Sequence, residues 1–224
     1  IVGTLIVYKQ IQFAKNRPVG YNRESLITVR INDPGFNGKL DVLRTELLNT
    51  GVVSETATSS GPLTAIWNST AGYDWPGKDP VVDAEFAICN VMGDFGKTVS
   101  WEIVAGRDYS KDFRRDSLDA IIVNEAALKY MGLKDPVGKE FTDVDEFGNK
   151  KWTRTIVGVV RDMVMESPYN PVRQTLYFYN PRVFMGQLHI RINPEASASI
   201  AVPKIKAVFN KIVPSALFDF TFVD

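Results

Sequence analysis

Two side chains are best suited to chemistry, the single histidine and the single cysteine of the sequence. His189 lies in the alternating run QLHIRIN, with no nucleophile motif beside it. A triad of the Ser-His-Asp kind would need it as a base, but we favour a structural or surface histidine. Cys89 ends the apolar run Phe86–Cys89 and is expected to be a buried small residue, not a reactive thiol. One cysteine cannot form an internal disulfide.

Metal and phosphate motifs are absent from the sequence, which has no His-Glu-x-x-His, no Cys-x-x-Cys and no phosphate-binding glycine loop. Asp143, Asp145 and Gly148 imitate part of a calcium loop. The fifth position of such a loop should be Asp or Asn, but here it is Phe147. We therefore favour a solvated hairpin tip, and predict no catalytic residue, no metal and no cofactor.

Aromatic residues form the more interesting candidate site. Trp67, Tyr73 and Trp75 gather near Phe86 in the first part of a β-rich region. Exposed aromatic side chains anchor many protein interfaces, so these three residues are a candidate partner surface. A β-rich core would use the same residue types, and we favour that interpretation.

The composition is that of an ordinary globular protein, with 45% hydrophobic, 23% charged and 11% aromatic residues among 224. This length suggests one large or two small domains. The formal net charge is zero and the sequence has no basic block, so nucleic acid is not an expected partner.

The first residues, Ile1–Tyr8, are almost wholly apolar before Lys9 and Gln10 break the run. A membrane span needs about 20 apolar residues, so this is not a whole one. It could be the tail of a span, a buried strand or the first turns of a core helix. It has neither the charged start nor the cleavage site of a signal peptide.

A strand–helix–strand order occurs near both ends of the chain. Ser25–Asn32 alternates like a strand, Leu40, Leu43 and Leu47 mark an amphipathic helix ended by Gly51, and Val52–Ser60 is a second strand. The later copy consists of the strand Gln187–Asn193, a helix with the stripe Ala201, Ile205, Val208 and Ile212, and the strand Leu217–Val223. Pro203 would be tolerated only in the first turn of that helix. Two such βαβ units predict a split, ferredoxin-like arrangement.

The region between the copies is expected to be mostly β. The predicted strands are Ala65–Tyr73, Asp83–Val91, Trp101–Ala105, Ala120–Asn124, Thr153–Val160 and Thr175–Tyr179. Gly93–Thr98 is expected to form one helical turn, and Asp143–Lys150 a hairpin tip. The fold class is therefore α+β, with residues 17–62 and 187–224 forming one subdomain and residues 63–186 an inserted β-rich subdomain.

The stretch Val123–Phe141, VNEAALKYMGLKDPVGKEF, has the clearest local signals. Asn124 is placed to cap a short helix over Glu125–Met131, and Gly132 to end it in a left-handed conformation. Ala105–Tyr109 (AGRDY) precedes this stretch, and Ile156–Asp162 (IVGVVRD) follows it. In this order and spacing, the motifs resemble the extracytoplasmic domain of MacB/FtsX-type ABC-transporter permeases.

The resemblance spans essentially the whole chain and implies a non-catalytic domain held between transmembrane helices at the cell (inner) membrane, on the periplasmic side. Residues 1–16 would be the end of a transmembrane or stalk helix, and residues 17–62 and 187–224 a porter-like subdomain. The implied partners are a cytoplasmic ATPase subunit or domain, a second permease copy, and a periplasmic adaptor, lipoprotein or peptide substrate. Both chain ends would leave the domain toward the membrane.

The function implied by the resemblance is mechanical transmission, which couples cytoplasmic ATP hydrolysis to export (efflux) or to other extracytoplasmic work. One alternative is a soluble extracytoplasmic module that binds a ligand or a partner, which a large apolar pocket would favour. The other is an enzyme, which a pocket holding several ionisable groups with perturbed pKa values would favour.

Overall fold

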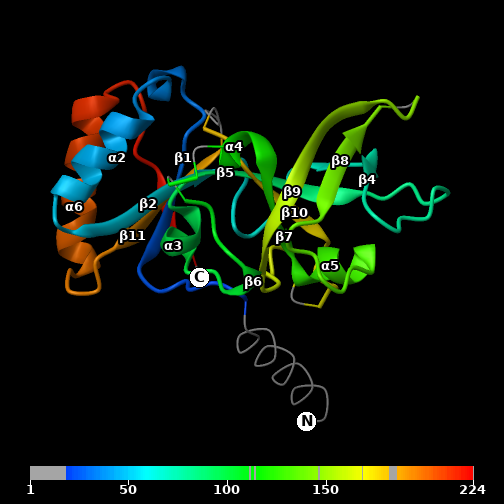
Figure 1. Cartoon of the computed structure of the whole chain (residues 1–224). Helices are drawn as coiled ribbons and strands as arrows, with labels where there is room; N and C mark the ends of the chain where they lie inside the picture. The colour runs from blue at the N-terminus through cyan, green and yellow to red at the C-terminus, as the bar shows by residue number, and fades with distance from the viewer. Residues whose placement is uncertain are drawn as a thin grey trace, which may run out of the picture.

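The computed structural model describes residues 19–110, 112–113, 115–145, 147–167, 169–181 and 186–223. Its centre is one mixed sheet of twelve strands, whose main path runs β12-β1-β11-β2-β5-β10-β7-β9-β8-β4. Figure 1 shows the sheet running from two long helices at one end to a projecting hairpin at the other. The predicted α+β class is confirmed. Residues 1–16, predicted to end a transmembrane or stalk helix, lie outside the described residues.

The two strand–helix–strand units build one end of the sheet together. The first comprises β1 (Leu26–Arg30), the short 3-10 helix η1 (Pro34–Phe36), α2 (Leu40–Asn49) and β2 (Val53–Ser59); the second comprises β11 (Gln187–Ile192), α6 (Ala198–Ile212) and β12 (Phe220–Phe222). β1 and β11 pair antiparallel, with Ile27 opposite Ile190, as the repeated order predicts. β12 pairs with the other side of β1, and β2 with the other side of β11.

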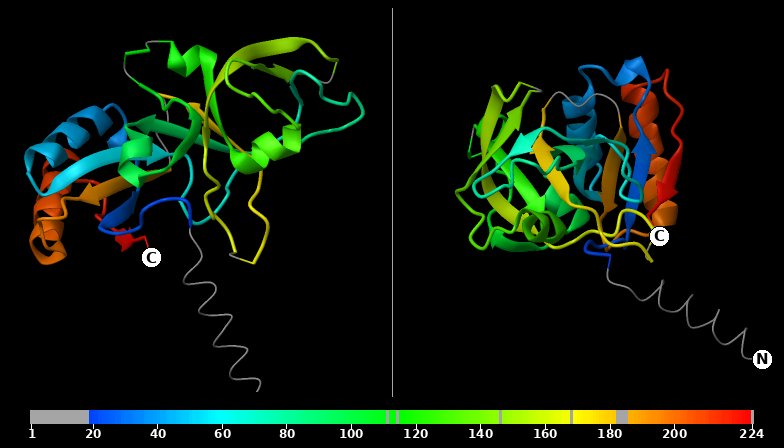
Figure 2. Two further views of the ribbon diagram at one scale, coloured as in Figure 1. Left: turned by 60° about the horizontal axis from the view of Figure 1, so that its bottom comes forward. Right: turned by 90° about the vertical axis from the view of Figure 1, so that its right-hand side faces the viewer.

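Both helices of this end cover one face of the sheet, side by side, as Figures 1 and 2 show. Their buried residues Leu43, Leu47, Ile205 and Phe209 follow the helical spacing and pack against the apolar residues of β1 and β11. The alternation of side chains along a strand places Ile27 and Val29 on this face and Leu26 on the other.

Two sequence expectations for the second unit were wrong in detail. α6 begins at Ala198, so Pro203 is its sixth residue and lies beyond the first turn. The helix continues past this proline, although proline has no N–H to donate to the preceding turn. The last strand is also shorter than Leu217–Val223, since only Phe220–Phe222 pairs with β1.

The region between the units contributes most of the remaining strands. In chain order its elements are β3 (Ser69–Thr70), β4 (Tyr73–Asp74), β5 (Phe86–Gly93), α3 (Phe95–Val99), β6 (Ile103–Gly106), α4 (Asp116–Asp119), β7 (Ala120–Asn124), α5 (Glu125–Met131), β8 (Glu140–Val144), β9 (Lys150–Val160) and β10 (Thr175–Tyr179). The predicted strand Ala65–Tyr73 is instead two short pieces. Gly72, at φ +89, separates them, and they pair with β5 and β8 respectively.

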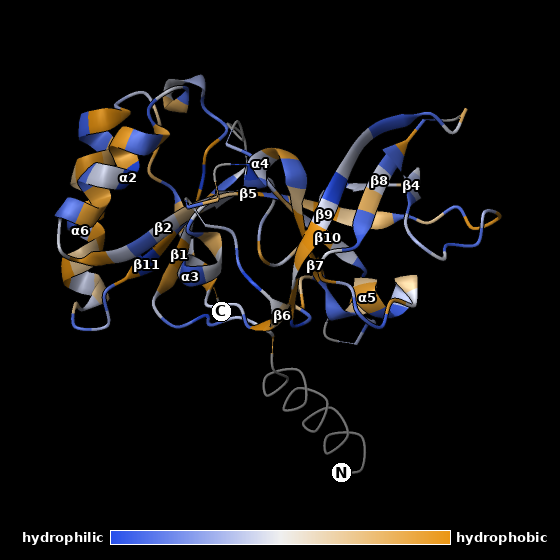
Figure 3. Cartoon of the chain, in the orientation of Figure 1, coloured by the Kyte–Doolittle hydropathy of each residue, from blue (hydrophilic) through white to orange (hydrophobic). Residues whose placement is uncertain are grey.

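The hairpin of β8 and β9 projects from this region, and its polarity changes along its length. Figure 3 shows hydrophobic residues in the inner half of β9 and hydrophilic residues toward the tip. Burial follows the same gradient, because Ile156, Val159 and Val160 are buried while Lys150 and Lys151 are exposed. The hairpin expected around Asp143–Lys150 is therefore present.

The two regions share hydrogen bonds and a core. β2 of the first region pairs with β5 of the second. A central apolar cluster combines Leu26 and Ala57 with Cys89, Trp101 and Tyr177. The division of the chain at residues 62/63 and 186/187 remains a prediction. Among the described helices, none has the length and apolar character that crossing a bilayer requires.

Candidate functional site

His189 is a buried structural histidine. Its side chain is 0% exposed, and its Nε2 lies 2.6 Å from Ser59 Oγ. Ser59 Oγ donates its hydrogen to Gly61 O at 2.5 Å, so it accepts the Nε2–H of the imidazole. Nδ1 has no hydrogen-bond partner among the described residues. Burial lowers the pKa of His189 to about 3, so the ring is neutral at physiological pH.

Cys89 lies in the central cluster at 4% exposure. Burial raises the pKa of its thiol to about 12. A reactive cysteine needs a lowered pKa and access to solvent, and this one has neither.

Asp145 uses its carboxylate to fold the tip of the β8–β9 hairpin. One oxygen accepts the N–H groups of Phe147 and Asn149 at 3.0 and 2.8 Å, and the other accepts Nδ2 of Asn149 at 3.0 Å. Asp143 instead lies 3.7 Å from Lys151 Nζ. Among the described residues, no three His, Cys, Asp or Glu side chains are grouped as metal ligands would be.

Of the three residues proposed as a partner surface, two are buried and one is exposed. Tyr73 and Trp75 are only 4% and 7% exposed, because they pack against Phe86 and Phe141 in the outer core. They are therefore unavailable as exposed anchors, which corrects that interpretation for both residues. Trp67 is 44% exposed, with the Arg30 guanidinium 5.6 Å from its ring, and it alone of the three remains a proposal for partner contact.

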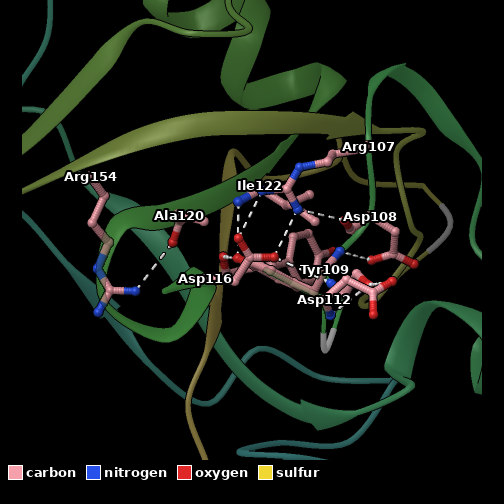
Figure 4. A network of polar contacts seen from close by, with 10 residues as sticks. Arg107, Asp108, Tyr109, Asp112, Asp116, Ala120, Ile122 and Arg154 are labelled. Carbon is pink, nitrogen blue, oxygen red and sulfur yellow. Dashed lines mark hydrogen bonds and ion pairs between the residues drawn. The ribbon is translucent and has the colours of Figure 1, made fainter. Parts of the chain in front are cut away.

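The Gly-Arg-Asp-Tyr motif takes part in a network of polar contacts, shown in Figure 4. Arg107 donates from both terminal nitrogens to the two carboxylate oxygens of Asp116, at 2.8 Å each. The Asp116 side chain is only 7% exposed, while that of Arg107 is 34% exposed. Arg107 also lies 3.7 Å from the ring centre of Phe113. These contacts fold the segment after β6 back onto α4.

The next two residues of the motif attach this segment to the sheet. Asp108 accepts Nε1 of Trp101 at 2.9 Å. Tyr109 donates its hydroxyl to Tyr177 O at 2.5 Å and accepts Ile122 N at 3.1 Å. The Tyr109 hydroxyl therefore links β7 to β10. It adds to the direct pairing of these two strands, which has only two residue pairs among the described residues.

The Asn-Glu-Ala helix and the Val-Val-Arg-Asp strand end, both of which the resemblance singled out, hold each other in place. Asn124 Oδ1 accepts Ala127 N at 2.9 Å and Thr175 N at 2.8 Å, which confirms the predicted helix cap. Asp162 Oδ1 accepts Ala126 N at 2.8 Å, and Glu125 Oε2 accepts Asp162 N at 3.1 Å. The helix start is thus bound to both β9 and β10.

Two glycines allow the strands bearing these motifs to approach closely. A Cβ on Gly158 would lie 2.2 Å from Arg107 O, and one on Gly106 would lie 2.2 Å from Val157 O. The motifs that carry the resemblance therefore have a structural role in this chain. These residues shape a rigid centre of the sheet, and their hydrogen-bonding groups are directed at one another.

The buried ion pair provides a stability prediction. Arg107→Leu leaves the Asp116 carboxylate nearly buried without its guanidinium, and we expect a loss of about 2 kcal/mol in the free energy of unfolding. Arg115→Leu is the matched control, because its pair with Asp119 is 78% and 48% exposed and should be worth about 0.5 kcal/mol or less. Urea unfolding of both variants measures the difference. Equal losses would contradict a structural role for the Arg107 pair.

The comparisons with known proteins concern the fold. No protein-family model matches the sequence, and no curated protein is significantly similar to it. Among solved structures, the periplasmic region of MacB from Actinobacillus actinomycetemcomitans aligns with 95% of this chain and 94% of its own, at a TM-score of 0.60 and 14% identity.

Two further structures are similar over nearly their whole lengths. A domain of a candidate permease protein from Porphyromonas gingivalis aligns with 91% of this chain and 93% of its own, at a TM-score of 0.55 and 13% identity. The extracellular domain of the noncanonic ABC-type transporter YknZ from Gram-positive bacteria aligns with 89% of this chain and 100% of its own, at a TM-score of 0.57 and 9% identity. The resemblance stated from the sequence is confirmed at the level of the fold.

Proposed function

We propose that this chain is an extracytoplasmic domain of an ABC-transporter permease and that it transmits movement instead of catalysing a reaction. The proposal rests first on the shared fold, because the similar structures are the periplasmic region of MacB, a domain of a candidate permease protein and the extracellular domain of an ABC-type transporter. The partners would be a cytoplasmic ATPase and a second permease copy, with a periplasmic adaptor, lipoprotein or peptide as cargo or contact.

The observation that supports the mechanical part is a hydrogen-bonded path from β1 and the last described residue to the far hairpin. Leu26 O accepts Val223 N at 3.0 Å, so the start of β1 and the last described residue are adjacent. Figures 1 and 2 show both described ends on the same side of the molecule. From there one sheet runs to β8 and β4. A displacement at the ends would therefore move the hairpin with it.

The alternative function, a ligand- or partner-binding module, is favoured by one observation. A hollow of about 320 Å³ lies between α2 and β2, and Leu40, Met92, Tyr179 and Leu188 are among the residues that line it. Such a site is compatible with a moving domain.

Cross-linking tests the proposal in the full-length transporter. Cysteines at Phe147, which is 80% exposed on the hairpin, would be joined between the two copies by bismaleimides of graded length. Cys89 is buried and should not react. We expect the cross-link to lower transport at least about tenfold with ATP binding unchanged, because the two states must differ at the hairpin.

The matched control is a cysteine at Ile200, which is 56% exposed on α6 at the opposite end of the sheet. Labelling it with a maleimide that has one reactive group should leave transport unchanged. Undiminished transport in the cross-linked Phe147→Cys protein, or no cross-link at any linker length, would contradict the proposed movement of paired domains.

A further inference from the structure

The segment that leads into β1, Val19–Ser25, contacts two separate parts of the fold. Figure 1 shows it in blue, passing below α3 to the start of β1. At one end of the segment, Val19 O accepts Val164 N at 2.9 Å, in the chain that follows β9. At the other end, Ser25 O accepts Ile192 N at 2.8 Å, at the end of β11. The segment is therefore attached both to the region between the units and to the second unit.

The Arg191 side chain holds the middle of this segment. It extends from β11 and is partly buried. Its Nη1 donates to Glu24 O at 2.6 Å, and its Nη2 donates to Asn22 O at 2.8 Å. Its Nε donates to Thr98 O in α3 at 2.7 Å. One guanidinium therefore joins the segment to β11 and to α3.

Arginine is the side chain suited to this set of contacts. Its guanidinium is planar and carries five N–H groups in fixed directions, so it can donate to three carbonyl oxygens at once. A lysine ammonium is a single point at the end of a flexible stem. The three hydrogen bonds of Arg191 all go to backbone carbonyls, which indicates that the side chain positions the chain around it.

The segment offers little apolar surface to the core. Tyr21 packs against the central apolar cluster, but Asn22, Glu24 and Ser25 are exposed. Ser25 also has a left-handed φ of +55, which is unfavourable for a residue with a side chain. A stretch held mainly by hydrogen bonds opens at a lower free energy than a packed sheet. Loss of the Arg191 contacts would therefore release the segment and leave the sheet folded.

We propose that Arg191 is a positioning residue that makes the segment Val19–Ser25 move as one body with the sheet. The chain is continuous, so a displacement of the residues that precede Val19 enters the described domain there. Arg191 passes this displacement to β11 and α3, and the hydrogen bond between Val19 and Val164 passes it to the chain after β9. The inference rests on the proposed transmission of movement, for which it names the residue that the input depends on.

The first test is hydrogen exchange on the 224-residue chain carrying Arg191→Met, which keeps an apolar stem but has no donor. The Asn22 amide donates to Val99 O at 2.9 Å. We expect its exchange to accelerate at least about tenfold, because the segment opens locally once the guanidinium contacts are lost. The amide of Ile156 in β9, which donates to Lys139 O, should keep its protection.

A second variant and a control complete this test. Arg191→Lys keeps the positive charge but loses the planar fork, so it should also accelerate exchange at Asn22, and it serves if Arg191→Met does not fold. Arg173→Met is the matched control, because the Arg173 side chain donates to the exposed Glu85 carboxylate and not to the segment. Unchanged exchange at Asn22 in both Arg191 variants, or an equal loss of protection at Ile156, would overturn the inference.

The second test uses the full-length transporter. We expect Arg191→Met to lower transport at least about fivefold while ATP hydrolysis continues, because the segment then moves without biasing the sheet between its two states. Arg173→Met should transport normally. If Arg191→Met transports normally while the cross-link at Phe147 blocks transport, the role of Arg191 is refuted and the proposed function stands. If neither change affects transport, the proposed function fails, and the role of Arg191 in it fails too.

Discussion

Acidification from pH 6.5 to 5 should lower the free energy of unfolding by about 2 kcal/mol, through His189 alone. The pKa of this histidine is lowered by burial to about 3 in the folded protein, against 6.5 for the free side chain. Between these values the unfolded chain binds a proton that the folded protein does not. Stability is therefore complete above pH 6.5 and falls as the pH drops toward 3.

The effect can be assigned by one variant, His189→Gln, because the sequence contains one histidine. Burial raises the pKa of the Asp108 carboxyl, but that group is unchanged in the variant. Most side-chain carboxyl groups titrate below pH 5. Urea unfolding at several pH values should give a slope that rises from about 0.7 kcal/mol per pH unit at pH 6.5 to about 1.3 kcal/mol per pH unit at pH 5. In His189→Gln the slope should nearly vanish, whatever the absolute stability of that variant is.

A second measurement does not depend on the variant. The imidazole resonances of the folded wild-type protein should stay those of a neutral ring down to pH 4.5. A histidine that titrates near pH 6.5 in the folded state, or an unchanged slope in His189→Gln, would show that Ser59 and the surrounding core do not exclude the charged form.

The sequence predicts elements well where the signals are local. β7 and α5 were predicted with the bounds that the structure has, because Asn124 and Gly132 fix the ends of the helix by contacts within one turn. The β1–β11 pairing was also predicted, through the repeated order of elements. β3 and β4 were predicted as one strand, because the alternation of residues does not reveal that Gly72 redirects the chain toward a different partner.

The polar centre was only partly predictable. Arg107, Glu125 and Asp162 lie in the sequence motifs that resemble the permease family, whereas Asp116 does not. The sequence does not reveal that Arg107 pairs with Asp116 or that Glu125 contacts Asp162, because these contacts depend on how the strands are placed. The hollow beneath α2 was missed for a similar reason. Its lining combines Leu40 of α2 with Met92, Tyr179 and Leu188, which lie far apart in the sequence.

Gly158→Ala should cost about 3 kcal/mol of the free energy of unfolding, at the upper end of the range for overpacking a core. The new Cβ would lie 2.2 Å from Arg107 O and 3.2 Å from Arg107 C, and both are backbone atoms that cannot rotate away. β6 would have to move from β9. The hydrogen bond from Arg107 N to Val157 O, 2.9 Å long, would then lengthen, and Arg107 would shift relative to Asp116.

Gly61→Ala is the matched control, since its Cβ would meet the Trp67 ring at 3.5 Å, an ordinary contact. We expect that change to be neutral or to stabilise by about 0.5 kcal/mol, because alanine restricts the unfolded chain. Hydrogen exchange should also locate the effect, with the amides of Gly106 and Arg107 losing protection in Gly158→Ala and keeping it in Gly61→Ala. If Gly158→Ala were as stable as the control, β6 and β9 could separate at little cost. The centre of the sheet would then be too compliant to carry movement from the chain ends to the hairpin.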